Sequence, residues 1–126
     1  MGKRFEFRDN RLKLDIDGNI FEIDTTDPEL VGRVHEFTVG AQEMASKLSQ
    51  KEHYAEALKE AIQFCLDTID SILGEGSSNK IFAGRKVSFF DCLDVIEYIT
   101  TEINADRESR FQKYSPNRAA RRTAKK

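Results

Sequence analysis

The chain has 126 residues, which is room for one domain and little else. Charged residues make up 33% of it and hydrophobic residues 39%, so a monomer would bury a modest core and would gain stability from self-association. The first residues lack the apolar core of a secretory signal, and no apolar run approaches the length that spans a bilayer. This pattern excludes a membrane protein and predicts a cytoplasmic location.

The charges are distributed unevenly along the chain. Residues 1–104 carry 12 basic and 20 acidic side chains, a balance of −8, whereas residues 105–126 carry 8 basic and 2 acidic ones, a balance of +6. An acidic body with a basic tail is typical of a protein that docks through its tail. The two cysteines, Cys65 and Cys92, form no Cys-x-x-C pair and lie among apolar residues, so we expect reduced, buried thiols.

The N-terminal segment alternates apolar and polar residues in the manner of β-strands, and Asp17-Gly18 is a pair that favours a tight hairpin turn. A turn centred there gives a register in which apolar residues share one face: Ile16 opposite Asn19, Leu14 opposite Phe21, and Leu12 opposite Ile23. The sequence therefore predicts an antiparallel β-hairpin over residues ~4–24. Whether Phe5 and Phe7 add a third strand is left open.

Three helices are predicted after the hairpin. The first, over residues ~28–48, begins at the capping Asp27 and at Pro28, and its apolar residues recur every three or four positions. The second, over ~50–73, begins at a Ser-x-x-Glu capping box formed by Ser49 and Glu52. The glycine-rich stretch 74–80 is typical of a loop, and Ser88 precedes the third helix, over ~88–104.

Together these elements predict an α+β fold in which the N-terminal antiparallel β-hairpin packs on three α-helices, as a single domain over residues 1–104. Residues 105–126 contain few apolar side chains. A segment of that composition cannot bury enough surface to offset its conformational entropy, so we expect a flexible, basic and largely disordered C-terminal tail.

No catalytic, cofactor-binding or metal-binding motif is found. The two histidines, His35 and His53, have no other ligand type at metal-binding spacing, and the serines and cysteines occupy caps and apolar stripes. Residues 15–19 contain two aspartates and a glycine, but the spacing differs from that of a calcium loop. We therefore expect a protein that is not an enzyme and that acts by binding another protein.

The basic tail has three interpretations. It could bind a protein partner, with Phe111 and Tyr114 as apolar anchors and three arginines as polar clamps, namely Arg118, Arg121 and Arg122. It could fold back onto the acidic body of its own chain. It could also neutralise nucleic-acid phosphates, although the acidic body would repel them. We rank the protein partner first, self-docking second and nucleic acid third.

The segment Tyr114–Arg122 (YSPNRAARR) resembles the Tyr-x-Pro-Asn-Arg-x-x-Arg-Arg ending of tail assembly chaperones from long-tailed bacteriophages and prophages. Residues 80–84 (KIFAG) and 88–99 (SFFDCLDVIEYI) resemble the last helix of the same family. The chain length and the order of a hairpin followed by helices are also similar. The resemblance thus covers residues ~80–122 by motif and the remainder by layout.

The resemblance implies an adaptor that binds the tape measure protein, keeps it soluble and helps tail tube subunits polymerise around it. Such chaperones work in the host bacterial cytoplasm and are generally absent from the finished virion. Many of their genes also produce a longer protein by ribosomal frameshifting, and the closing Lys125-Lys126 is compatible with an A-rich slippery site. A slippery heptamer in the gene would support that hypothesis, and its absence would exclude it.

A phage tail assembly chaperone is therefore the leading function expected from the sequence. The alternatives are a small nucleic-acid-binding regulator that acts through its basic tail and a structural component of the phage head–tail connection. For the chaperone we expect homo-oligomers, because several copies give avidity for a long client. Exposed members of the apolar stripes, with Phe89 and Phe90 as candidates, would form the oligomer or client surface.

Overall fold

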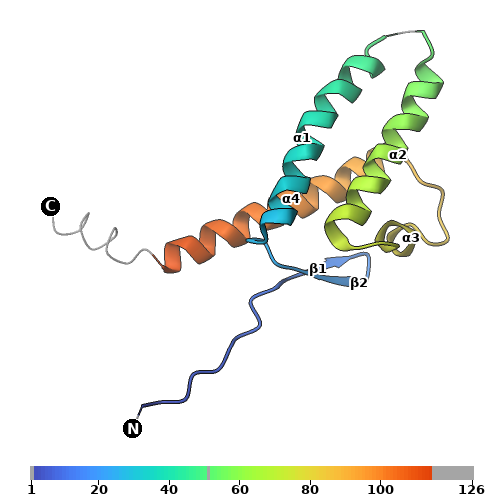
Figure 1. The fold of residues 1–126 in the computed structure, drawn as a ribbon. Helices are drawn as coiled ribbons and strands as arrows, with labels where there is room; N and C mark the ends of the chain where they lie inside the picture. The colour runs from blue at the N-terminus through green and yellow to red at the C-terminus, as the bar shows by residue number, and fades with distance from the viewer. Residues whose placement is uncertain (1, 51, 115–126) are drawn as a thin grey trace, which may run out of the picture.

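The computed structural model describes residues 2–50 and 52–114. Within them a two-stranded antiparallel hairpin is followed by four helices, which confirms the predicted α+β fold and adds one helix to the predicted three. Figure 1 shows a long hairpin of two helices, α1 and α2, rising from the body, with α4 crossing behind them and the β-hairpin at the base. None of the described helices is long and apolar enough to cross a membrane.

The β-hairpin consists of β1 (Leu12–Ile16) and β2 (Asn19–Ile23), and its register is the predicted one, with Leu14 opposite Phe21. The turn residues Asp17 and Gly18 have φ angles of 52° and 88°, the left-handed conformations that this tight turn requires. Alternate residues of each strand are buried against the helices, so one face of the hairpin joins the core.

The segment before β1 does not form a third strand. Residues 2–11 have no regular secondary structure, and every described residue up to Arg11 is exposed. The rings of Phe5 and Phe7 contact each other edge to face, with centroids 4.9 Å apart, and do not contact the core. In this structure the segment pairs with neither strand of the hairpin and covers no apolar face of the described residues.

Helix α1 (Pro28–Leu48) begins as predicted. The Asp27 carboxylate accepts a hydrogen bond from the N–H of Glu29 at 3.0 Å, and Pro28 occupies the first turn, where its missing N–H is not needed. Only Leu30 is fully buried on this helix, although it belongs to a continuous apolar stripe. The rest of the stripe is half-buried because α1 packs chiefly on α2.

Helix α2 (Tyr54–Leu73) begins four residues later than predicted, so the capping-box prediction at Ser49 was wrong. Ser49 instead terminates α1: its N–H donates to the carbonyl of Ala45 and its hydroxyl to that of Ser46 at 2.6 Å. The chain then reverses, and His53 adopts a left-handed φ of 58° immediately before α2. A serine can cap either end of a helix. Here the chain reverses directly after Ser49, so this serine caps the C-terminal end of α1 and not the N-terminal end of α2.

The predicted loop at residues 74–80 contains a short helix, α3 (Ser77–Ile81). Its first turn is held by Asp70 of α2, whose carboxylate accepts a hydrogen bond from the N–H of Ser78 at 2.8 Å. Gly74 and Gly76 have positive φ angles that let the chain turn from α2 into α3. Ile81 and Phe82 are buried at the end of α3, and they anchor this connection to the core.

Helix α4 (Phe89–Lys113) extends well beyond the predicted end at residue 104, so the first part of the predicted tail is helical. Its buried residues follow one stripe through Cys92, Ile96, Ile99 and Ile103. Beyond that stripe the helix is mainly polar, and an ion pair between Asp106 and Arg110 at 2.9 Å supports it. Residues 115–126 lie outside the described part of the chain.

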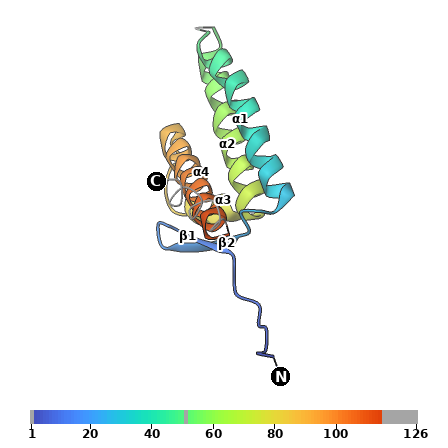
Figure 2. The same cartoon turned by 90° about the vertical axis from the view of Figure 1, so that its left-hand side faces the viewer.

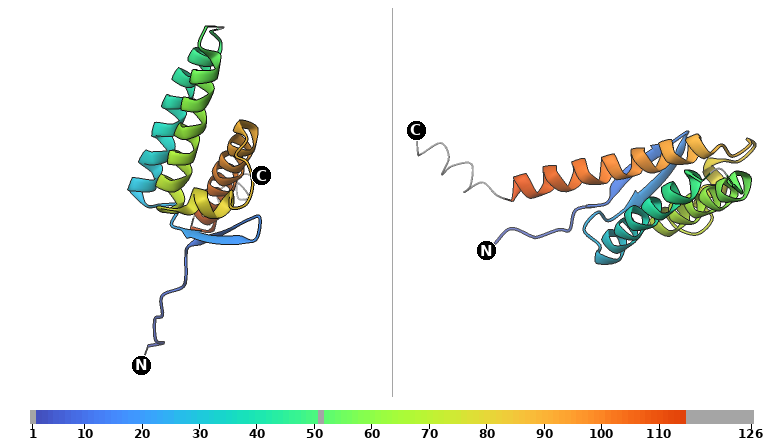
Figure 3. Two further views of the ribbon diagram at one scale, coloured as in Figure 1. Left: turned by 90° about the vertical axis from the view of Figure 1, so that its right-hand side faces the viewer. Right: turned by 90° about the horizontal axis from the view of Figure 1, so that it is seen from above.

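The core lies where α2, α4 and the hairpin meet. Its fully buried side chains come from all three: Leu14 from β1, Cys65 and Ile69 from α2, and Ile99 and Ile103 from α4. Figures 2 and 3 show that α4 flanks only the lower part of α2, so that the far half of the α1–α2 hairpin projects beyond the body. We call this projecting part, residues 37–48 of α1 with residues 54–64 of α2, the helical arm.

Gly40 allows the two helices of the arm to approach closely. A Cβ atom at this position would lie 2.5 Å from the ring of Phe64, which stacks on Phe37 with centroids 5.5 Å apart.

We expect Gly40→Ala to destabilise the protein by about 1 kcal/mol, because overpacking outweighs the gain in helix propensity. Gly32→Ala on the same helix meets no atom within 4 Å and should stabilise it by about 1 kcal/mol. Urea unfolding followed by circular dichroism measures both, and equal effects would contradict the proposed close contact.

Candidate protein-binding site

The described residues do not bring together a metal site or an activated nucleophile. No group of three His, Cys, Asp or Glu side chains in residues 2–50 and 52–114 could hold a metal ion. Cys65 and Cys92 are free thiols with fully buried side chains, as expected from the sequence. Burial raises the pKa of Cys65 to about 11 and also raises that of Cys92, so neither thiol is activated. What the described chain offers instead is a set of apolar and charged surfaces.

The first surface is the helical arm. Its two helices meet through the stacked rings of Phe37 and Phe64 and through an ion pair between Lys47 and Glu60 at 3.8 Å. A hollow of about 190 Å³ lies on this seam, between Met44 and Phe64. Two helices alone cannot enclose an apolar stripe from all sides, so the side chains along the seam remain half-buried.

The flank of α2 that faces α4 continues into the arm, where its larger side chains are less completely buried. Ala61, Cys65 and Ile69 on this flank are buried, whereas Ile62 and Leu58, one and two turns nearer the tip than Cys65, are half-buried, and Ile62 packs against the edge of the core. Helix α4 begins at Phe89 and flanks only the lower part of α2 (Figure 3). An apolar track therefore runs from the start of α4 towards the tip of the arm.

Phe89 and Phe90, predicted as an oligomer or client surface, lie at the start of α4, and they differ in burial. Phe89 is half-buried and packs against the core, whereas the side chain of Phe90 is 74% exposed. Their ring centroids are 6.0 Å apart. The structure thus places Phe90 at the surface and Phe89 at the edge of the core, and their role in binding stays a prediction.

The end of α4 is fixed to the loop between β2 and α1. Asp106 is the centre of this contact: its carboxylate accepts a hydrogen bond from the hydroxyl of buried Thr25 at 2.7 Å and pairs with Arg110. Arg110 also donates to the side-chain oxygen of Asn10 at 3.2 Å. The contact holds the last turns of α4 in place against the body.

Phe111 and Tyr114 lie just beyond this contact, with side chains 60% and 75% exposed. They line a hollow of about 180 Å³ together with Asp24 and Thr25. The two aromatic residues that were predicted as anchors are therefore brought close together and face solvent. Three further predicted residues, Arg118, Arg121 and Arg122, lie outside the described residues.

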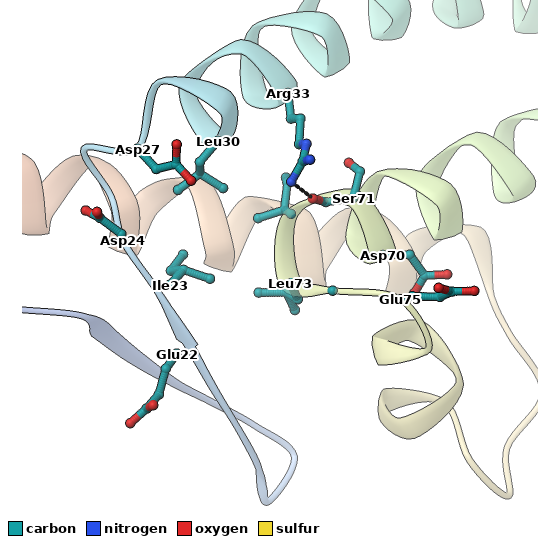
Figure 4. A pocket seen from close by; sticks show the side chains of 12 residues that line it. Glu22, Ile23, Asp24, Asp27, Leu30, Arg33, Asp70, Ser71, Leu73 and Glu75 are labelled. Carbon is teal, nitrogen blue, oxygen red and sulfur yellow. Dashed lines mark hydrogen bonds between the residues drawn. The ribbon is translucent and has the colours of Figure 1, made fainter.

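Sequence patterns did not indicate a further hollow, of about 500 Å³, which we call the acidic hollow (Figure 4). Buried apolar residues, among them Leu30 and Ile72, lie beneath it, and five carboxylates line it: Glu22, Asp24, Asp27, Asp70 and Glu75. Arg33 crosses one side and donates to the carbonyl of Ser71 at 2.8 Å. Two hydrogen bonds from Thr26 hold the pKa of Asp24 below its usual value, so this carboxylate stays charged at neutral pH. The lining residues come from separate elements, and no motif in the sequence links them.

The fold and these surfaces define a small α+β protein with a projecting helical hairpin and several apolar surfaces bordered by charge. Comparison with known families shows that the chain belongs to DUF6673, described as a family of unknown function, which it matches over residues 17–125. That span covers the hairpin turn, all four described helices and most of the basic C-terminal segment. No curated protein and no solved structure matches the chain.

The contact of Asp106 with Thr25 and Arg110 predicts a loss of stability when Asp106 is replaced. We expect Asp106→Ala to lower the free energy of unfolding by about 2 kcal/mol, because it removes charge-assisted hydrogen bonds and leaves a buried hydroxyl without its acceptor. Asp94→Ala, at an exposed site on the same helix, should change it by less than about 0.5 kcal/mol. Chemical unfolding compares the two variants, and similar losses would show that the contact does not hold α4.

The buried thiol of Cys65 predicts a dependence of stability on alkaline pH. Its pKa is raised in the folded state, so the unfolded chain loses this proton first and stability falls between about pH 9 and about pH 11. The loss attributable to Cys65 should be roughly 2 kcal/mol over that interval. Unfolding curves of the wild type and Cys65→Ala at several pH values measure it. A pH dependence that is the same in both proteins would contradict the assignment.

Proposed function

We propose that this protein is a tail assembly chaperone of a long-tailed bacteriophage or prophage, and that it binds the tape measure protein during tail assembly in the bacterial cytoplasm. Two independent considerations support the proposal. The first is the resemblance of residues ~80–122 to that class of chaperones. The second is the shape and chemistry of the helical arm. In this role the protein binds a client and catalyses no reaction.

The half-buried apolar track on the arm is the observation that carries the proposal. Leu58 and Ile62 continue the flank of α2 that α4 covers lower down, and Phe90 is exposed at the start of α4. A client helix laid along this track would take the place of a third helix in the arm. It would convert a two-helix hairpin into a three-helix layer, which buries the half-exposed stripe.

A tape measure protein is a suitable client for such a track, because it offers long amphipathic helices that are exposed before the tail tube forms. Each chaperone would cover a short length of client helix, since the arm is only three to four turns long. Several copies bound along one client would add their affinities through avidity. This arrangement would keep the client soluble until tail tube subunits displace the chaperone.

The end of α4 supplies a second point of contact in this proposal. Phe111 and Tyr114 are exposed next to the basic segment, as expected for apolar anchors beside polar clamps. The segment contains Arg118, Arg121 and Arg122, whose positive charges would pair with acidic side chains of the client. Binding would therefore combine an apolar contact on the arm with a salt-sensitive contact at the end of α4.

Capture of an amphipathic helical segment of a tape measure protein tests the role of the arm. Leu58→Asp places a charge on the track and should weaken capture at least tenfold, because a buried leucine contributes about 1.5–3 kcal/mol. The matched control is Lys59→Asp, an exposed position one residue further along α2, which should capture the segment like the wild type. Equal capture by both variants would exclude the track as the binding site.

Removal of residues 113–126 separates the chaperone from a nucleic-acid-binding regulator. The chaperone should retain client capture with lower affinity after the truncation and should not retain mixed-sequence DNA in either form. Retention of DNA that disappears with the truncation, together with no capture of the client, would overturn the proposal. Detection of the protein in purified virions would instead favour a structural head–tail component.

A further inference from the structure

The N-terminal arm, residues 2–10, extends away from the body as an exposed segment (Figure 1). It carries Phe5 and Phe7, whose side chains are 75% and 91% exposed, and basic residues on either side of them. Alternate residues of an extended chain point to opposite sides, so the two rings share one side and Arg4, Glu6 and Arg8 share the other. Two phenylalanines so exposed are available for docking, and burying them would release about 1.5–3 kcal/mol each.

The acidic hollow has the complementary chemistry. Its lining includes four apolar residues, of which Ile23, Leu30 and Ile72 are buried and Leu73 is half-buried, and carboxylates border it on the sides of β2, α1 and α2 (Figure 4). Arg33 is the one cation among its lining residues. A ligand for this site would therefore have apolar side chains for the apolar lining and positive charges for the rim.

The strand beside the hollow also has an unpaired edge. In the hairpin register Leu14 and Phe21 form a hydrogen-bonded pair, so the N–H and C=O groups of the alternate residues Ile20 and Glu22 point away from β1. The sheet of the described residues has only two strands, and none lies on that side of β2. An edge of this kind can accept one more extended strand.

We propose that the N-terminal arm of a second copy of this chain docks on the acidic hollow, as an added strand on the edge of β2. Phe5 and Phe7 would cover the apolar lining near Leu30 and Leu73. The positive charges of Lys3, Arg4 and Arg8 would lie against the carboxylates of the rim. The N-terminal arm is about 30 Å long when extended, which is long enough to reach from one copy of the protein to another.

A second copy fits this role better than the other segments of the chain. The chain's own arm is fixed at its base, where Asn10 is bonded to Arg110 of α4, and from there it extends away from the body (Figure 1). Residues 115–126 are basic, but they contain no large apolar side chain to cover the apolar lining. Exchange between two copies also satisfies both arms and both hollows in one symmetric dimer.

The mass of the protein in solution, measured by light scattering over a range of concentrations, is the first test. The wild type should form dimers, and Phe5→Ser with Phe7→Ser should weaken dimerisation about a hundredfold, since two buried aromatic anchors are lost. Tyr54→Ser, which removes an exposed aromatic residue at the far end of the helical arm, is the control and should dimerise like the wild type. A wild type that is monomeric throughout, or a dimer that does not depend on Phe5 and Phe7, would overturn the proposal.

Disulfide trapping locates the contact. A Glu6→Cys chain mixed with a Glu75→Cys chain should form a disulfide-linked heterodimer. The control is a Glu52→Cys chain, which carries its cysteine at the tip of the helical arm and should form no disulfide with the Glu6→Cys chain. A third chain carries both Glu6→Cys and Glu75→Cys. If it forms an internal disulfide and keeps the mass of a monomer, the N-terminal arm occupies the hollow of its own chain, and the second-copy proposal is overturned. Neither measurement uses a client or DNA. Failure of the dimer proposal would therefore not count against the proposed chaperone function, which is tested separately by client capture.

Discussion

The burial of α2 between two different partners is the constraint on which the rest of the structure depends. One flank of this helix meets α1 through Phe64, and another meets α4 through Cys65 and Ile69, which are fully buried. Because α1 packs chiefly on α2, its position depends mainly on that contact, and the close approach at Gly40 makes the contact possible. The arm that results is long and narrow, and its apolar seam extends beyond the point where α4 begins.

The register of the hairpin and the class of the fold could be predicted because each rests on local chemistry. The turn at Asp17-Gly18 needs left-handed backbone, and the alternation of Leu12, Leu14 and Ile16 allows only one pairing that keeps apolar residues together. The start of α1 was equally clear, because Asp27 and Pro28 act within one turn of the helix. In each case the information lies within a few residues of the element that it determines.

The errors arose where a distant contact decides the outcome. The continuation of α4 past residue 104 depends on Thr25, far away in sequence, which bonds Asp106 and holds a polar stretch of helix against the body. Helix α3 depends on Asp70 of the preceding helix. The acidic hollow was missed for the same reason, since its carboxylates come from a strand, a loop and the end of a helix that meet only in the folded chain. The sequence did identify the exposed aromatic residues at the end of α4, but it could not show that they lie beside Asp24.

The proposed client site and the proposed dimer contact lie on different parts of the molecule, and this separation has a mechanical consequence. The helical arm rises from one end of α2, whereas the acidic hollow lies beside β2 at the other end, near Leu73 (Figures 1 and 4). A dimer joined through the hollows would leave both helical arms free, so each dimer would present two client tracks. Two linked tracks bind a long helix more tightly than two separate ones, because the second contact forms at a high effective concentration. Self-association at the base of the molecule would in this way strengthen client binding at the arm without adding a contact there.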